Sequence, residues 1–289
     1  MENVLKDRVA IVTGAGRGIG QAIAVAFARQ GASLYLAART GSDLAETAAA
    51  CREVGGQAHP VVTDVASWEQ VQNLVTTAFQ KASQVDILVN SAGIYGPIGP
   101  TAEIHLSDWK RAVEINLFAP LYLCRALMPH MIQRRQGKII LLGGGGATTP
   151  LPNFSSYAAS KAGLARLADT LAEELKPFNV QINVTAPGLV DTKLQDEVLQ
   201  AGSRAGGLYE KIKQARETGK GAVSPKIVAD LAVFLASEAS GKLTGKLIAA
   251  PHDPWRDWGG KGDELNATPM YTIRRLDPFT IKPLIKDLV

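Results

Sequence analysis

The sequence predicts an α/β protein with a doubly wound, seven-stranded parallel sheet, built by a single domain with a C-terminal extension. Three observations indicate this fold. Short apolar runs alternate with helical patterns over most of the chain, and a glycine-rich turn joins the first run to the first helix. Glycine, Asn and Thr clusters follow the apolar runs, where the carboxyl ends of parallel strands share one edge of a sheet. Right-handed crossovers then place helices on both faces.

The expected elements follow one another in a regular order. Apolar runs predict strands at 9–12, 34–37, 59–63, 85–89, 138–142, 180–185 and 246–250. Helical patterns occupy 19–30, 44–54, 68–81, 107–136 and 155–176, and Ser224 followed by Pro225 begins another helix. The polar stretch 192–221 is expected to be flexible. Residues 1–250 form the expected domain, and residues 251–289 form the extension.

The first strand leads into the turn Thr13-Gly14-Ala15-Gly16-Arg17-Gly18-Ile19-Gly20. Glycines let the backbone approach a pyrophosphate, and the start of the next helix supplies amide donors. A strand, a glycine turn and a helix in this order predict a dinucleotide site of the Rossmann type. An ordinary tight turn between a strand and a helix is the alternative.

The end of the second strand indicates which dinucleotide binds. NAD sites usually place a carboxylate there to hold the ribose 2′-hydroxyl. This chain has Arg39 instead, with no carboxylate before Asp43, and Arg17 lies in the glycine turn. Two guanidiniums favour a 2′-phosphate, and therefore NADP(H). Two ordinary surface arginines are the alternative.

Tyr157 and Lys161 lie four residues apart in the 155–176 helix, so both side chains project from one face. A lysine ammonium beside a phenol stabilises the phenolate and lowers the phenol's pKa. Such a tyrosine can exchange a proton near neutral pH, as general acid–base catalysis requires. In isolation the spacing fits an inert helix pair, and the surrounding motifs favour catalysis.

Together these motifs resemble the classical short-chain dehydrogenases/reductases over about residues 7–250. Besides the glycine turn and the Tyr157–Lys161 pair, the resemblance rests on Asp64-Val65, Asn90-Ser91-Ala92-Gly93, Asn116, Pro187-Gly188 and Thr192. It implies an oxidoreductase, often a homotetramer, that moves a hydride between NADP(H) and a ketone or secondary alcohol.

The resemblance also implies residue roles. Tyr157 is the acid/base, Lys161 holds the nicotinamide ribose and assists it, and Asn116 holds a relay water. The implied cofactor-binding residues are Gly14, Arg17, Gly18, Ile19, Gly20, Arg39, Asp64, Val65, Asn90, Ala92, Gly93, Lys161, Pro187, Gly188, Val190 and Thr192.

One position departs from the family pattern. A serine usually stands thirteen residues before the tyrosine, where it hydrogen-bonds the substrate oxygen, and here that position is Gly144. Backbone amides of the run 143–146 or a water could replace it, as could a hydroxyl of Thr148, Thr149, Ser155 or Ser156. A third interpretation is an impaired relative that binds NADP(H) as a sensor or scaffold. Gly144→Ser is expected to raise the rate with ordinary ketones.

The identity of the substrate depends on two segments whose roles the sequence does not determine. In this family 192–221 closes over the substrate, and its basic side chains Arg204, Lys211, Lys213 and Arg216 fit either a solvated face or a lid for acidic substrates. In the extension, Trp255 and Trp258 are expected to pack at a subunit interface or to form a pocket wall.

Composition excludes several other functions. The net charge of +4 comes without a Lys/Arg block, which argues against nucleic acid as a partner. No apolar run is long enough for a membrane span, and the N-terminus lacks a signal peptide, so a cytoplasmic location is expected. The two cysteines fit buried thiols, and the four histidines have no metal-ligand spacing. The expected partners are a small carbonyl or alcohol substrate and further copies of the chain, in a tetramer or dimer.

Overall fold

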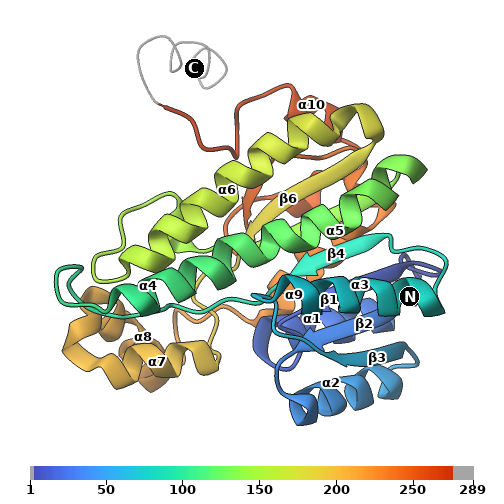
Figure 1. The fold of residues 1–289 in the computed structure, drawn as a ribbon. Coiled ribbons are helices and arrows are strands. Elements are labelled where there is room, and N and C mark those ends of the chain that lie inside the picture. The colour runs from blue at the N-terminus through green and yellow to red at the C-terminus, as the bar shows by residue number, and fades with distance from the viewer. Residues whose placement is uncertain (1–2, 276–289) are drawn as a thin grey trace.

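The computed structural model describes residues 3–275 of the 289-residue chain. Within them, a parallel sheet of seven strands runs in the order β3-β2-β1-β4-β5-β6-β7 (Figure 1), as predicted. The strands are β1 (Val9–Thr13), β2 (Ser33–Ala38), β3 (Gln57–Val62), β4 (Ile87–Asn90), β5 (Gly137–Leu142), β6 (Val180–Ala186) and β7 (Leu247–Ala249). Strand order reverses between β1 and β4, and ligands bind at the carboxyl ends of the strands beside such a reversal.

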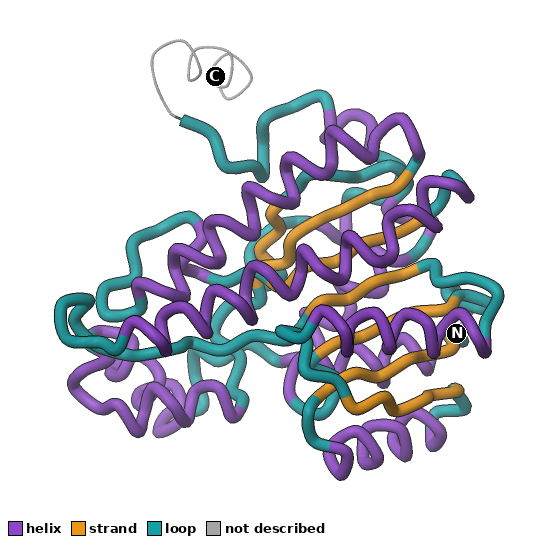
Figure 2. Tube along the Cα trace, viewed as in Figure 1, coloured by secondary structure: helices purple, strands orange, loops and turns teal. Residues whose placement is uncertain are grey.

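Helices cover both faces of the sheet (Figure 2). One face carries α1 (Gly18–Arg29), α2 (Gly41–Glu53) and α9 (Pro225–Ala236), and the other carries α3 (Trp68–Lys81), α5 (Ala119–Arg134) and α6 (Ser155–Leu175). Each face has its own apolar core because strand side chains alternate in direction. Val12 thus packs with α1 and α9, whereas its neighbour Ile11 packs with α3 and α5. No helix among residues 3–275 is long and apolar enough to cross a membrane.

The long helix predicted at 107–136 is divided into three parts. α4 (Leu106–Val113) leads into a π-helical turn (Glu114–Phe118), and α5 follows. A π-turn inserts an extra residue into a helix and occurs often at functional sites. Here it contains Asn116, whose side chain is fully buried.

The expectation of a flexible stretch at 192–221 is wrong. α7 (Lys193–Ala201) and α8 (Gly207–Thr218) occupy most of it, joined by a short turn (Gly202–Ala205). The helices form because they can bury apolar side chains: Val198 and Ile212 pack against Tyr95 and Phe154, far away in the sequence. Tertiary packing of an apolar face supplies most helix stability in proteins.

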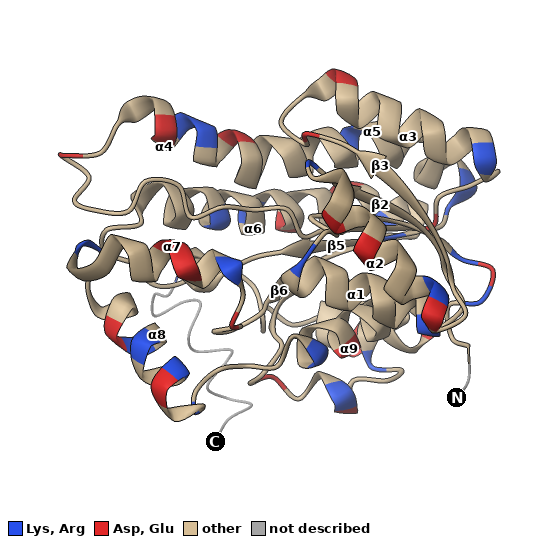
Figure 3. Cartoon of the chain, turned by 90° about the horizontal axis from the view of Figure 1, so that it is seen from below, with Lys and Arg blue, Asp and Glu red and all other residues tan. Residues whose placement is uncertain are grey.

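Lys193 lines a cavity, but the four basic residues singled out for a lid face solvent or pair with acids of the chain. Arg204 pairs with Glu103, and Arg216 pairs with Asp191 and Asp196. Lys211 and Lys213 are exposed. Acidic and basic residues are mixed along α7 and α8 (Figure 3), which supports the solvated-face interpretation.

The described part of the extension folds back onto its own chain and includes α10 (Gly262–Asn266). Trp255 and Trp258 are buried, at 4% and 5% exposure, in the core beneath α1 and α9. The Trp255 ring lies 5.9 Å from Phe234, and the Trp258 ring lies 4.6 Å from Tyr271. Neither indole is left for an interface or a pocket wall, so both expectations for them are corrected. Residues 276–289 of the predicted extension lie outside the described residues.

Candidate active site

The glycine turn holds the chain closer to its neighbours than any side chain would permit. Gly14 and Gly18 have φ of 62° and 59°, in the left-handed region. A Cβ on Gly14 would lie 2.7 Å from the Ala92 amide nitrogen, and one on Gly20 would lie 2.2 Å from the Gly14 carbonyl oxygen. Arg17, at the start of α1, makes no side-chain cap, so the first amides of α1 remain available to an anion.

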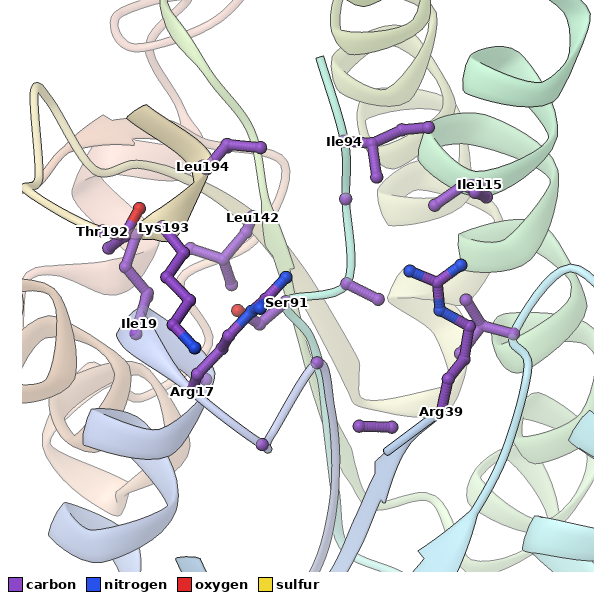
Figure 4. Close-up of a pocket in the computed structure, with 18 of the residues that line it drawn as sticks. Arg17, Ile19, Arg39, Ser91, Ile94, Ile115, Leu142, Thr192, Lys193 and Leu194 are labelled. Carbon is purple, nitrogen blue, oxygen red and sulfur yellow. The ribbon is translucent and has the colours of Figure 1, made fainter. Parts of the chain in front are cut away.

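A cavity of about 270 Å³ runs from this turn to Tyr157. The predicted site residues on its wall are Gly14, Arg17, Gly18, Ile19, Gly20, Arg39, Asp64, Val65, Ala92, Gly93, Tyr157, Lys161, Pro187 and Thr192. Arg17 and Lys193 enter the cleft from one side and Arg39 from the other (Figure 4). The structure therefore separates the two arginines that the sequence grouped at the ribose.

The cavity is also lined by residues outside the predicted site set: Gly16, Ala38, Thr40, Asp43, Thr63, Ser91, Ile94, Ile115, Leu142, Gly143, Lys193, Leu194 and Glu197. Most of them neighbour a predicted residue along the chain. Glu197 is different, because only helical spacing from Leu194 could have indicated it.

Four predicted residues lie behind the wall. Asn90 is buried, and its Nδ2 has no hydrogen-bond partner among the described residues. Gly188 has a φ of 76° and packs against Pro251. Val190 bridges to Val223. Asn116 is the fourth.

Asn116 fastens three segments around the cavity. Its Oδ1 accepts from the Ile94 amide at 3.0 Å, and its Nδ2 donates to the Ile94 carbonyl at 2.8 Å and to Ser160 Oγ at 3.1 Å. A Cβ on Gly93 would lie 3.1 Å from Asn116 Oδ1 and 3.5 Å from Lys161 Nζ, so these groups lie close together. Both Nδ2 hydrogens are used by the protein, which makes the Asn116 side chain a positioning group.

Tyr157 and Lys161 face the cavity from the first turns of α6, as their spacing predicts. Lys161 Nζ donates to the Leu142 carbonyl at 2.7 Å and lies 5.7 Å from the centre of the Tyr157 ring. Burial raises the pKa of Tyr157, and the neighbouring Tyr95 adds to the rise. The pKa of Tyr157 is thus raised in the structure, where the sequence predicted a lowering.

Lys161 is itself buried beside a neutral acceptor, and burial lowers its pKa to about 8 from 10.5. Between these values the unfolded chain binds a proton that the folded chain has released, so stability rises with pH. Lys161→Met is therefore expected to raise the free energy of unfolding at pH 7 by about 1–3 kcal/mol, because it removes a buried charge.

Urea unfolding at several pH values tests this expectation. The gain over wild type should shrink as pH rises from 8 toward 10.5, where the wild-type lysine is neutral in the folded state and becomes neutral in the unfolded state. Lys176→Met, near the end of the same helix and exposed, should give no such gain. An equal effect of both substitutions would contradict the assignment.

Gly144 is required by the close approach of Tyr157 and not by its backbone angles. Its φ of 177° is extended and available to any residue. A Cβ at this position, however, would lie 2.1 Å from Tyr157 Oη and 2.8 Å from Cζ, whereas one on Gly145 would meet nothing within 4 Å. A serine at 144 would displace the phenol, so the expectation that it raises the rate is corrected.

The four hydroxyls considered as substitutes for the serine are engaged or remote. Thr149 Oγ1 donates to the Gly145 carbonyl, and Ser156 Oγ donates to the Tyr95 carbonyl. Ser155 Oγ accepts from the Trp109 indole. Thr148 is exposed. None of the four lines the cavity, which leaves backbone amides or water beside Gly144 to polarise a carbonyl.

The sequence and the fold match a known family of enzymes. The model of the family described as short chain dehydrogenase matches residues 8–202. The chain belongs to the short-chain dehydrogenase/reductase family. Members of this family are oxidoreductases that use nicotinamide cofactors.

Individual relatives in the family act with different substrates and cofactors. The 7alpha-hydroxysteroid dehydrogenase of Escherichia coli is 31% identical over 265 residues, covering 91% of this chain and 97% of the relative. A single-residue variant of the actinorhodin polyketide ketoreductase with NADPH superposes with a TM-score of 0.78 at 28% identity, covering 86% of this chain and 97% of that one. NAD+-bound xylitol dehydrogenase superposes with a TM-score of 0.77 at 26% identity, covering 85% and 98%.

Proposed function

We propose that this short-chain dehydrogenase/reductase is an NADP(H)-dependent enzyme that transfers a hydride between nicotinamide and a ketone or secondary alcohol. The observation that carries the proposal is the placement of Tyr157 and Lys161 on the wall of the cavity that the glycine turn lines. An acid/base pair and a phosphate-binding turn on one cavity supply the two requirements of the reaction.

The residues fit the cofactor, and different residues would bind the diphosphate and transfer the proton. Gly14, Gly18 and the start of α1 would hold the diphosphate, since a side chain on either glycine would fill the space. The bound dinucleotide supplies or accepts the hydride. Tyr157 would donate a proton to the carbonyl oxygen in reduction and remove it from the alcohol in oxidation. The phenol is protonated at neutral pH, as a general acid must be, while its raised pKa makes it a weaker proton donor.

Lys161 would position the ribose next to the nicotinamide, and Asn116 would hold the loop after β4 around it. In solution, we propose that the protein is a cytoplasmic homo-oligomer, a tetramer or a dimer. Residues 1–250 would form the catalytic domain, with 192–221 as a lid over the substrate.

NADP(H) is proposed over NAD(H) because Arg39 follows β2 where a carboxylate would serve NAD. It enters the cleft near Thr63 and Asp64, and Asp64 is held by Arg111 at 2.7 Å. Burial would raise the pKa of Asp64, but the Ala66 amide, Arg111 and, more weakly, the charge of Arg39 outweigh burial and lower it. Within residues 3–275, Asp64 forms its ion pair with Arg111 and none with Arg39, so the Arg39 guanidinium can bind a 2′-phosphate.

Arg39→Ala is expected to weaken NADPH binding by about tenfold to a hundredfold and NADH binding by less than about twofold, since only NADPH loses a charge-assisted contact. Titration of cofactor fluorescence gives both dissociation constants. Arg52→Ala, an exposed arginine on the adjacent α2, serves as the control. Equal loss for both cofactors would overturn the NADP(H) assignment.

The reaction is tested with a broad panel of ketones and NADPH, and with secondary alcohols and NADP, by following nicotinamide absorbance. Turnover of at least one class supports the proposal. Tight NADPH binding without turnover of any compound would instead support a sensor or scaffold, the alternative that Gly144 favours.

A further inference from the structure

A carboxylate lies on the face of α7 that is turned toward the cavity. Leu194, Glu197 and Val198 are three and four residues apart and share that face. Leu194 and Glu197 line the cavity, and Val198 is fully buried in the apolar cluster beneath α7 and α8. Glu197 thus occupies a position at which the pattern of the helix calls for an apolar side chain.

The surroundings of Glu197 connect it to the acid/base tyrosine. The Tyr95 backbone amide is near enough to this carboxylate to lower its pKa. The Tyr95 ring lies 4.8 Å from the Tyr157 ring. Burial raises the pKa of Glu197, while Arg17 and the Tyr95 amide oppose the rise. A partly desolvated carboxylate therefore faces the cavity near Tyr95, the residue whose ring packs against Tyr157.

Arg17 is the basic side chain whose charge acts on Glu197, and the other charges of the cavity lie elsewhere or are paired. Arg17, Arg39 and Lys193 project into the part of the cleft where the glycine turn would place the phosphates of the dinucleotide (Figure 4). Lys161 is bound to the Leu142 carbonyl. Of the other two acids on the wall, Asp64 pairs with Arg111, and Asp43 lies beside Gly16 in the glycine turn.

The part of the cavity near Tyr157, which we call the reaction end, has several apolar side chains on its wall. Ile94, Ile115, Leu142 and Leu194 line it, and in Figure 4 Ile94 and Leu194 approach it from opposite sides. The basic side chains of α8 and the preceding turn do not compensate Glu197, because Arg204 and Arg216 pair with other acids. An anionic substrate would meet apolar walls and a carboxylate of the same sign.

We infer that Glu197 selects uncharged ketones and alcohols with an apolar body, binds a hydroxyl donor when the substrate carries one, and rejects substrates with a carboxylate or phosphate. This inference rests on the proposed function and names its substrate class. It reverses the idea of a lid biased toward acidic substrates. Like charges near each other in a site of low dielectric repel strongly enough to exclude a partner.

The test compares a β-keto ester, ethyl acetoacetate, with its free acid, acetoacetate, under NADPH. Wild type should prefer the ester in kcat/KM by about tenfold or more. Glu197→Gln should raise kcat/KM for the acid by about tenfold and change that for the ester by less than about threefold. Glu210→Gln removes the same charge from an exposed position on α8 and should match wild type.

Preference of wild type for the acid, or equal shifts in the two variants, would overturn the inference. Failure of the proposed function is recognised separately, because both compounds can be titrated against the enzyme–NADPH complex by cofactor fluorescence. There, Glu197→Gln should tighten binding of acetoacetate and leave binding of the ester unchanged even if neither compound reacts. No change in acetoacetate affinity would contradict the role of Glu197.

Discussion

Tyr157→Phe is expected to lower kcat for ketone reduction by about a hundredfold to ten-thousandfold, the range over which a positioned general acid contributes. NADPH affinity should change by less than about twofold, because the lost hydroxyl is the proton donor and the ring remains. The phenol lies on the cavity wall with 8% exposure, so the phenylalanine ring fits the same space.

Single-turnover reduction of a ketone by the NADPH-loaded enzyme measures this effect on the chemical step. Tyr122→Phe on α5 removes a hydroxyl of the same kind outside the cavity and should keep the wild-type rate. Retention of more than about a tenth of the wild-type rate by Tyr157→Phe would assign the proton to another group. The reaction would then need a donor such as water beside the glycine run.

Gly144→Ser is expected to lower kcat by about a hundredfold, although it restores the residue that the family usually has. The serine Cβ would lie 2.1 Å from Tyr157 Oη, far inside van der Waals contact. The phenol must move, and it cannot move freely because the Tyr95 ring packs 4.8 Å from the Tyr157 ring. Displacing a catalytic group by about 1 Å costs about a hundredfold in rate.

Gly145→Ser is the matched control for this loss. It places the same side chain one residue later, where a Cβ meets nothing within 4 Å, and it should leave kcat within about threefold. A higher rate for Gly144→Ser than for wild type would show that the phenol shifts easily and that the serine supplies the missing donor. Equal loss in both variants would point to the loop as a whole and not to the Tyr157 contact.

If Gly144→Ser is harmful, the group that polarises the substrate carbonyl belongs to the backbone or to water. The hydroxyls of Thr149, Ser155 and Ser156 are bound to other groups of the protein. Gly143, the residue before Gly144, lines the cavity, so backbone of the glycine run reaches the cavity wall there. Exposed amides in such a turn can stabilise developing negative charge.

The sequence by itself determined the order of the strands and helices, the glycine turn, and the placement of Tyr157 and Lys161 on one helix face. These features depend on local periodicity and on short motifs, which physical rules connect directly to backbone geometry. Once parallel strands are expected, their carboxyl ends must share one edge. The sequence alone therefore assigns the turn at 13–20 and the helix at 155–176 to one site.

Tertiary structure alone decided the features that depend on residues far apart in the chain. The segment 192–221 is helical because its apolar side chains find Tyr95 and Phe154. Trp255 and Trp258 are buried because the extension folds back onto the core beneath α9.

The chemistry of the site depends on distant contacts in the same way. The pKa of Tyr157 is raised because the fold buries the phenol and places Tyr95 beside it. The roles of Gly144 and Glu197 follow only from their surroundings. The Tyr157 phenol lies against Gly144, and Glu197 lies on the cavity wall. Distances between non-neighbouring residues set these effects, and periodicity along the chain carries no information about such distances.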